Sequence, residues 1–145
     1  MNRKWEDIEI GEVTGRVDFI VTTEMADEYI AAVGMLSSHT AALNTSAGRL
    51  VPVDLVCKLS MRELFTKFTV GQLGPNLRAK QTYRFIRPIL VGTRVSAIGR
   101  ITDKYEKRGK SYLTLHATFV DESGQSLVVD ERVVILLSGD VKIKG

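Results

Sequence analysis

Residues that bind metals or form disulfides are scarce in this 145-residue sequence. Its single cysteine, Cys57, has no partner for an internal disulfide, and two histidines are too few for a typical structural zinc site. No apolar run approaches the roughly 18 residues of a membrane-spanning helix, and the N-terminal residues turn acidic where a signal peptide needs an apolar core. The sequence also lacks a phosphate-binding loop and a dinucleotide fingerprint. We therefore expect a cytoplasmic protein with no metal, cofactor, disulfide or membrane segment.

The overall composition is that of an ordinary globular protein, with 26% charged and 44% hydrophobic residues. At roughly 150 residues per domain, the length predicts one domain over residues 1–145. The net charge of +3 is unevenly distributed, because the stretch from Lys58 to Lys110 has thirteen basic and only three acidic residues. Such a stretch fits either an anionic partner or solvated strand faces. Neither interleaved aromatic residues nor a recognisable motif accompanies it, so we do not expect nucleic acid to be the partner.

The spacing of apolar residues predicts one strand and two helices in the first half of the chain. Residues 13–21 alternate as a strand, and Thr22 begins a helix that Gly34 ends. Residues 35–51 are rich in Ser, Thr, Asn and Gly, which predicts a loop with at most one short helical turn. Pro52 opens the second helix, which ends at Gly71, Gly74 and Pro75. One apolar stripe about four turns long follows this helix: Val53, Cys57, Met61, Leu64, Phe65 and Phe68.

The second half of the chain predicts four strands in a meander, at residues 77–88, 94–106, 111–120 and 127–137. In the first of them, alternation places Leu77 on the apolar face and Arg78 on the outer face. The order lacks the βαβ alternation of a parallel sheet. Because the long apolar stripe must be covered along its whole length, we predict an α+β hot-dog fold, an antiparallel sheet wrapped around one long apolar helix. A cone-shaped α+β barrel is the alternative.

Three segments, in order, resemble the MaoC-like dehydratase family, which includes (R)-specific enoyl-CoA hydratases. Residues Trp5–Gly11 are similar to the family's acidic-apolar entry segment, and Glu24–Gly34 is similar to the helix before its catalytic loop. The segment Tyr83–Gly92 resembles a strand and turn with an aromatic residue, Arg-Pro and a closing glycine. The resemblance implies a hot-dog fold and activity on an acyl thioester, carried by coenzyme A or by acyl carrier protein.

The chain departs from the family at the catalytic loop, which reads roughly Gly-Asp-x-Asn-Pro-x-His. Alignment on Gly34 places Met35 at the aspartate and Thr40 at the histidine, and His39 lies one position early. Hydration of an enoyl thioester needs groups that take up and deliver protons near neutral pH, which methionine and threonine cannot do. The missing Asp/His pair therefore predicts weak or absent activity of this chain alone. The remaining candidate for the acid–base role is His39, with a surface loop histidine as the alternative.

The resemblance also covers the start of the long helix. It assigns the amide of Val53 there to the thioester carbonyl, with an ordinary helix start as the alternative, and Ser38 and Thr40 to substrate binding. Asp54, one residue further, is the candidate that orients His39, although an acid in a first helical turn also complements the helix dipole. We interpret Cys57 as a core residue and His116 as a partly exposed strand residue.

Three functions stay open. The chain is a hydratase or dehydratase with His39 in a rearranged site, a non-catalytic thioester-binding or structural subunit that pairs with an active relative, or a thioesterase of the same fold. A thioesterase needs a carboxylate along the helix, for which Asp54 and Glu63 are the candidates. In each case we expect a homodimer or a hetero-oligomer with a related hot-dog subunit, because a five-stranded sheet around one helix leaves exposed edge strands.

Overall fold

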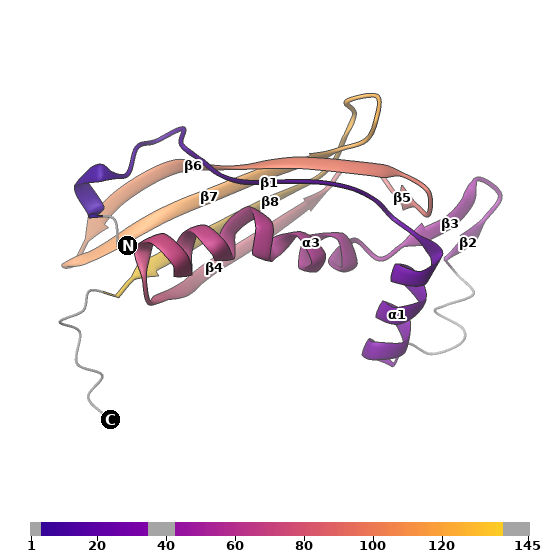
Figure 1. Cartoon of the computed structure of the whole chain (residues 1–145), viewed down its shortest axis with the longest axis horizontal. Helices are drawn as coiled ribbons and strands as arrows, with labels where there is room; N and C mark the ends of the chain where they lie inside the picture. The colour runs from indigo at the N-terminus through magenta and orange to yellow at the C-terminus, as the bar shows by residue number, and fades with distance from the viewer. Residues whose placement is uncertain (1–3, 35–42, 138–145) are drawn as a thin grey trace.

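A five-stranded antiparallel sheet curves around one long helical segment (Figure 1). The structure is a computed structural model that describes residues 4–34 and 43–137. In sheet order the strands are β1 (Val13–Ile20), β6 (Arg94–Lys107), β7 (Lys110–Val120), β8 (Ser126–Leu136) and β4 (Asn76–Phe85). The predicted α+β hot-dog architecture is confirmed, and the cone-shaped barrel is not the fold.

The helical segment begins with α3 (Val53–Met61) and continues through two π-helical turns, η2 (Arg62–Thr66) and η3 (Thr69–Leu73). It runs on past Gly71 and ends at Gly74. The predicted stripe is buried at Cys57, Leu64, Phe65 and Phe68, whereas Val53 and Met61 are half-buried. Leu55, Val56 and Ser60 are buried as well. The buried surface is wider than one stripe because the sheet wraps around the helix instead of lying flat against it.

Two paired glycines let the helix approach the sheet backbone. Gly15 on β1 is opposite Gly99 on β6, and the η2 turn lies against both. A Cβ on Gly15 would overlap the carbonyl of Glu63, and one on Gly99 would lie 2.9 Å from the carbonyl oxygen of Leu64. The Thr14 hydroxyl donates a 2.6 Å hydrogen bond to that same Leu64 carbonyl. A π turn leaves carbonyls without their usual helical donors, and β1 supplies one from outside.

The first helix forms as predicted, as α1 (Thr23–Val33). The Thr22 hydroxyl accepts a hydrogen bond from the amide of Met25 at 3.2 Å, and Gly34 takes the left-handed conformation that ends the helix. A short 3₁₀ turn, η1 (Trp5–Asp7), precedes β1.

The prediction of a loop up to residue 51 is wrong in its last part. A small second sheet forms there from β2 (Asn44–Thr45), β3 (Gly48–Val51) and β5 (Ile89–Leu90). The ion pair between Arg49 and Asp27, at 2.8 Å, joins this sheet to α1.

The prediction of a four-strand meander is also wrong. Strands β6, β7 and β8 follow one another, but β4 pairs with β8 and not with β6. The reason is that β1 occupies the other edge of β6, in a register from Val13 opposite Arg100 to Ile20 opposite Arg94. With that edge of β6 occupied, β4 pairs along β8 instead, and this arrangement places β1 and β4 at the two borders of the sheet.

A β-bulge at Ala79 reverses the predicted alternation at the start of β4. Arg78 is opposite Val134 and Lys80 is opposite Val133, so one residue of β4 has no partner on β8. The bulge turns Leu77 outward, where 56% of its surface is exposed. Arg78 turns to the inner side and its guanidinium donates a 2.7 Å hydrogen bond to the Gln81 side chain.

Candidate functional site

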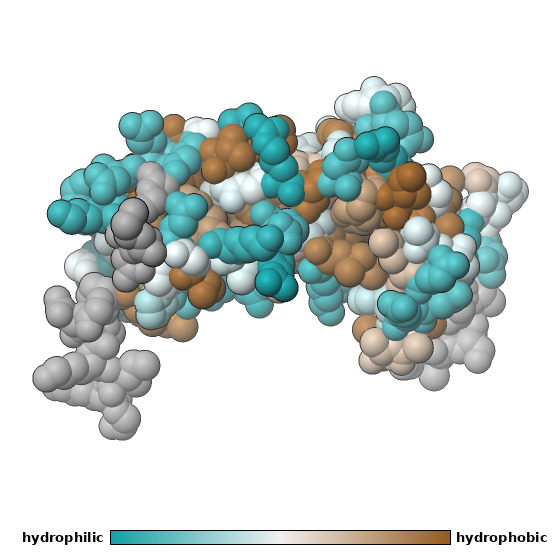
Figure 2. Space-filling model, viewed as in Figure 1, coloured by the Kyte–Doolittle hydropathy of each residue, from teal (hydrophilic) through white to brown (hydrophobic). Residues whose placement is uncertain are grey.

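The start of α3 is the part of the predicted site that the structure describes. Pro52 is the capping residue, with φ −58° and ψ 128°, and Val53 is the first helical residue. The amide of Leu55 donates to the Pro52 carbonyl at 3.0 Å. The first amides of a helix have no acceptor within it and carry the positive end of its dipole. Figure 2 shows apolar surface gathered around the start of α3 and the neighbouring β5, a setting that strengthens such an interaction.

Two of the five predicted site residues fall in this first turn, Val53 half-buried and Asp54 exposed. The other three, Ser38, His39 and Thr40, lie outside the described residues, as does Met35. That Asp54 orients His39 therefore stays a prediction.

A pocket of about 290 Å³ lies between α1 and the first turns of α3. It is lined by Met25, Glu28, Tyr29, Leu55, Lys58 and Leu59. The Lys58 ammonium lies 5.6 Å from the centre of the Tyr29 ring. Burial, and secondly the negative charge of Asp54, raise the pKa of Tyr29, so its phenol keeps its proton at neutral pH.

The carboxylates proposed for a thioesterase are far apart along the helix. Glu63 follows Asp54 by nine residues, which is roughly 13 Å at the rise of an α-helix. Glu63 is exposed and forms an ion pair with Lys67 at 2.8 Å. Asp54 is therefore the carboxylate that lies at the helix start.

A buried ion pair lies between the sheet and the helix, and the sequence analysis missed it. The Arg132 guanidinium donates to both oxygens of Asp130, at 2.8 and 3.3 Å, and the two residues are 4% and 0% exposed. The guanidinium also lies over the ring of Phe65, at 4.7 Å from its centre. Among the described residues no buried side-chain nitrogen or oxygen lacks a hydrogen-bond partner. The signal that could have revealed the pair is the i, i+2 spacing of two charged residues in an apolar central strand.

This ion pair lies close to Cys57 and Tyr83. Burial, with a second contribution from the Asp130 carboxylate, raises the pKa of the Cys57 thiol to about 12. Burial, and secondly the Asp130 carboxylate, also raise the pKa of Tyr83. The Tyr83 hydroxyl accepts a hydrogen bond from the Gln81 side-chain amide. A thiol that is 1% exposed and protonated at neutral pH is not a nucleophile. The interpretation of Cys57 as a core residue is confirmed.

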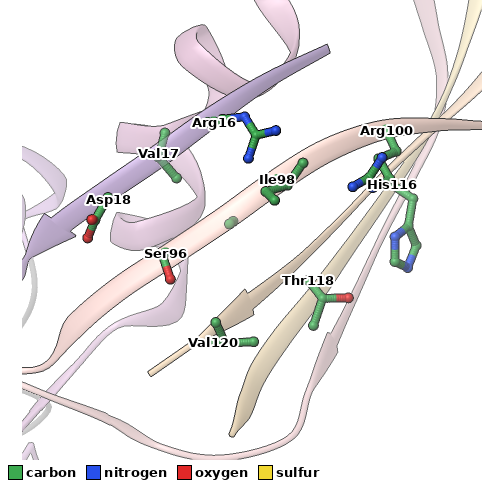
Figure 3. A pocket seen from close by; sticks show the side chains of 10 residues that line it. Arg16, Val17, Asp18, Ser96, Ile98, Arg100, His116, Thr118 and Val120 are labelled. Carbon is green, nitrogen blue, oxygen red and sulfur yellow. The ribbon is translucent and has the colours of Figure 1, made fainter. Parts of the chain in front are cut away.

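A hollow of about 730 Å³ lies on the outer face of the sheet (Figure 3). Arg16, Arg100 and His116 project into it from β1, β6 and β7. Asp18, at its rim, is held by a two-fold hydrogen bond from Arg94, at 2.9 Å for each contact. His116 is half-buried, as predicted. Of the predicted site residues that the structure describes, neither Val53 nor Asp54 borders this hollow, and the sheet separates it from α3.

Within residues 4–34 and 43–137, no three His, Cys, Asp or Glu side chains lie close enough together to hold a metal ion. No helix in these ranges is long and apolar enough to span a membrane.

Solved structures of low sequence identity have the same fold. The monoamine oxidase regulatory protein from Archaeoglobus fulgidus is 16% identical, with a TM-score of 0.75 over 93% of this chain and 94% of its own. An (R)-hydratase from A. caviae involved in PHA biosynthesis is 20% identical, with a TM-score of 0.71 over 91% and 99%. The HadBC (3R-hydroxyacyl-ACP dehydratase) complex from Mycobacterium tuberculosis contains a chain that is 20% identical, with a TM-score of 0.70 over 88% and 98%.

Comparison with curated protein sequences gives no match. Comparison with protein families matches residues 9–130 to the family described as FAS1-like, dehydratase domain region. This match covers well over half of the chain, and together with the structural neighbours it confirms the resemblance to MaoC-like dehydratases. The chain is therefore a member of the FAS1-like dehydratase family, with the MaoC-like hot-dog fold.

Proposed function

We propose that this protein binds an acyl thioester, carried by coenzyme A or acyl carrier protein, with the thioester carbonyl at the start of α3. Its reaction class is hydration and dehydration, and its activity alone is weak or absent. The observation that carries the proposal is the helix start, where Pro52 caps α3 and the amide of Val53 comes first. We place the protein in the cytoplasm, because its one cysteine cannot form an internal disulfide and the fold therefore does not depend on an oxidising compartment.

The chemistry of the reaction explains why the helix start matters. Negative charge develops on the thioester oxygen when the enoyl group is attacked, and preorganised amides stabilise that charge most in an apolar setting. Val53 is half-buried at the start of α3. The surface around this helix start and β5 is apolar (Figure 2). A binding site of this kind remains useful even where the proton-transfer groups have been lost.

The proton-transfer groups are where this chain differs from its family. Met35 and Thr40 stand in the sequence where the resemblance places Asp and His. His39 is then the only histidine near this segment, and Asp54 is the carboxylate proposed to orient it. Replacing His39 with alanine should lower any measurable turnover by about 10²–10⁴.

A second candidate function is that of a non-catalytic subunit paired with an active relative. The HadBC neighbour supports it, since that dehydratase is described as a complex. In this arrangement our chain supplies structure and thioester contacts, and the partner supplies the acid and base. A chain that lacks the Asp/His pair gains a function by pairing that it would not have alone.

The test uses Val53, because proline is accepted at the first position of a helix and has no N–H. Pro52 already has the extended ψ that a following proline requires. Val53→Pro should weaken binding of crotonyl-CoA roughly 2- to 10-fold in titration calorimetry, the contribution of one hydrogen bond. Val53→Ala keeps the amide and removes the same side-chain methyls, so it should bind like wild type.

Two results would contradict the proposal. One is wild-type protein that shows no affinity for crotonyl-CoA, and the other is equal affinity of the proline and alanine variants. Loss of the enoyl absorbance in the same samples measures hydration and separates an active enzyme from a binding subunit.

A further inference from the structure

We propose that the free edge of β4 binds a related subunit whose own edge strand is acidic, and that the basic side chains of β4 disfavour pairing with a second copy of this chain. This inference rests on the pairing half of the proposed function and names the chemistry of the partner.

The edge of β4 is open for pairing. The strand is last in the sheet order, with β8 on one side, and among the described residues no strand lies on its other side (Figure 1). It is ten residues long, whereas exposed edge strands are usually short or interrupted. Its backbone therefore offers a row of N–H and C=O groups to another strand, broken only by the bulge at Ala79.

Large apolar side chains are exposed along the same edge. Leu77 is 56% exposed, Phe85 is 60% exposed, and Ile86, directly after the strand, is 43% exposed. The ring of Phe85 stacks on that of Tyr83, with 6.3 Å between the ring centres. Apolar residues at both ends of an exposed edge strand favour coverage by another protein, since water alone leaves their surface unfavourably hydrated.

The charge of this edge has one sign. Between Glu63 and Asp103 the sequence has no acidic residue, and Lys80 and Arg84 are exposed on the outer face of β4. Glu131 on β8 is the acidic residue next to them, opposite Thr82. Within the described residues no ion pair joins it to either cation. The outer face of the edge is thus cationic where another strand would pair.

Pairing with a second copy would bring these cations together. In an antiparallel pair of two β4 strands centred on Thr82, Lys80 of each copy is directly opposite Arg84 of the other. If the pair is instead centred on Lys80, the two Lys80 side chains are opposite each other, and a centre on Arg84 does the same for Arg84. Centres on Gln81 or Tyr83 place like charges at diagonal positions. Like charges at such positions destabilise a sheet, and opposite charges stabilise it by similar amounts. An acidic edge strand turns each of these repulsions into an attraction, and this difference provides the selectivity.

The experiment uses a charge-reversed copy of this chain as the acidic partner. Wild type is mixed with ¹⁵N-labelled Lys80→Glu/Arg84→Glu protein, and native mass spectrometry and sedimentation measure the three possible dimers. We expect the mixed dimer to bind at least about tenfold more tightly than the wild-type dimer at low salt, with the difference shrinking at 0.5 M salt as charges are screened. The matched control is Arg16→Glu/Arg62→Glu, with the same charge change on β1 and the helix, which should show no preference for wild type.

A mixed dimer at or below its statistical share, or a control that pairs equally well, would overturn the inference. If the reversed protein does not fold by circular dichroism, Lys80→Gln/Arg84→Gln replaces it and is expected to self-associate more tightly than wild type. Equal self-association would then overturn the inference. Because no readout uses a thioester, failure here leaves crotonyl-CoA binding as the separate test of the proposed function.

Discussion

The ion pair between Asp130 and Arg132 gives the sharpest test of how this core is stabilised. Replacing Arg132 with methionine keeps most of the side-chain stem but leaves the Asp130 carboxylate, 0% exposed, without its partner. Removing one member of a buried ion pair costs about 3–5 kcal/mol, because the remaining charge has lost both water and its counter-ion. The variant also loses the contact of the guanidinium with the Phe65 ring at 4.7 Å.

An exposed ion pair of equal length serves as the control. Lys67 and Glu63 are also 2.8 Å apart, but their side chains are 56% and 47% exposed, against 5% and 1% for Arg132 and Asp130. Lys67→Met should therefore cost less than about 1 kcal/mol. The two pairs have the same shortest N–O distance, so the difference between them reflects burial, together with the second hydrogen bond and the Phe65 contact of Arg132.

The assay is urea unfolding of all variants at one protein concentration, since association stabilises the folded state. The double variant Asp130→Leu/Arg132→Met should regain most of the loss, because no buried charge remains. A cost below roughly 1 kcal/mol for Arg132→Met would refute the reasoning. It would mean that water reaches Asp130 in solution.

Three further predictions concern the same core. Phe65→Ala should lower the free energy of unfolding by about 3–5 kcal/mol, as for other buried large side chains, and urea unfolding measures it. Gly15→Ala should cost roughly 1–3 kcal/mol because its Cβ overlaps the Glu63 carbonyl, whereas Gly71→Ala, with open space around it, should be neutral or slightly stabilising in the same assay. Cys57 has a folded pKa of about 12, above the roughly 8.5 of an unfolded thiol, so its contribution is complete below pH 8.5 and is lost as the pH rises toward 12. Stability measured from pH 8 to 11 should therefore fall less steeply for Cys57→Ala, and an equal slope would contradict the raised pKa.

The fold could be predicted because its strongest signals are local. The stripe from Cys57 to Phe68 and the alternation in β7 each identify one element and its buried face. The cap at Thr22 and the left-handed Gly34 bound α1 as the sequence indicates. An apolar helix of this length needs a cover, and an antiparallel sheet is the cover that the remaining strands can form.

The predictions that were wrong concern features that depend on residues distant in sequence. The letters around Ala79 keep alternating through the bulge, so nothing local shows that Leu77 turns outward. Periodicity encodes neither the pairing of β1 with β6 nor the place of β4 beside β8. The inward position of Asp130 and Arg132 follows from the register of β8 against β4 and β7, which the sequence alone does not show.

The candidate site has one part that depends on the backbone and one that depends on particular side chains, and this difference has a functional consequence. The helix start at Val53 is a property of the backbone, so it persists through any change of side chain in the preceding loop. Proton transfer in the proposed site, in contrast, depends on particular side chains at the positions that the resemblance assigns to Met35 and Thr40, and single substitutions can remove them. A hot-dog subunit can thus lose its acid and base while it keeps its thioester site, and selection can then act on its edge strand instead. The basic edge of β4 is where such selection would be visible.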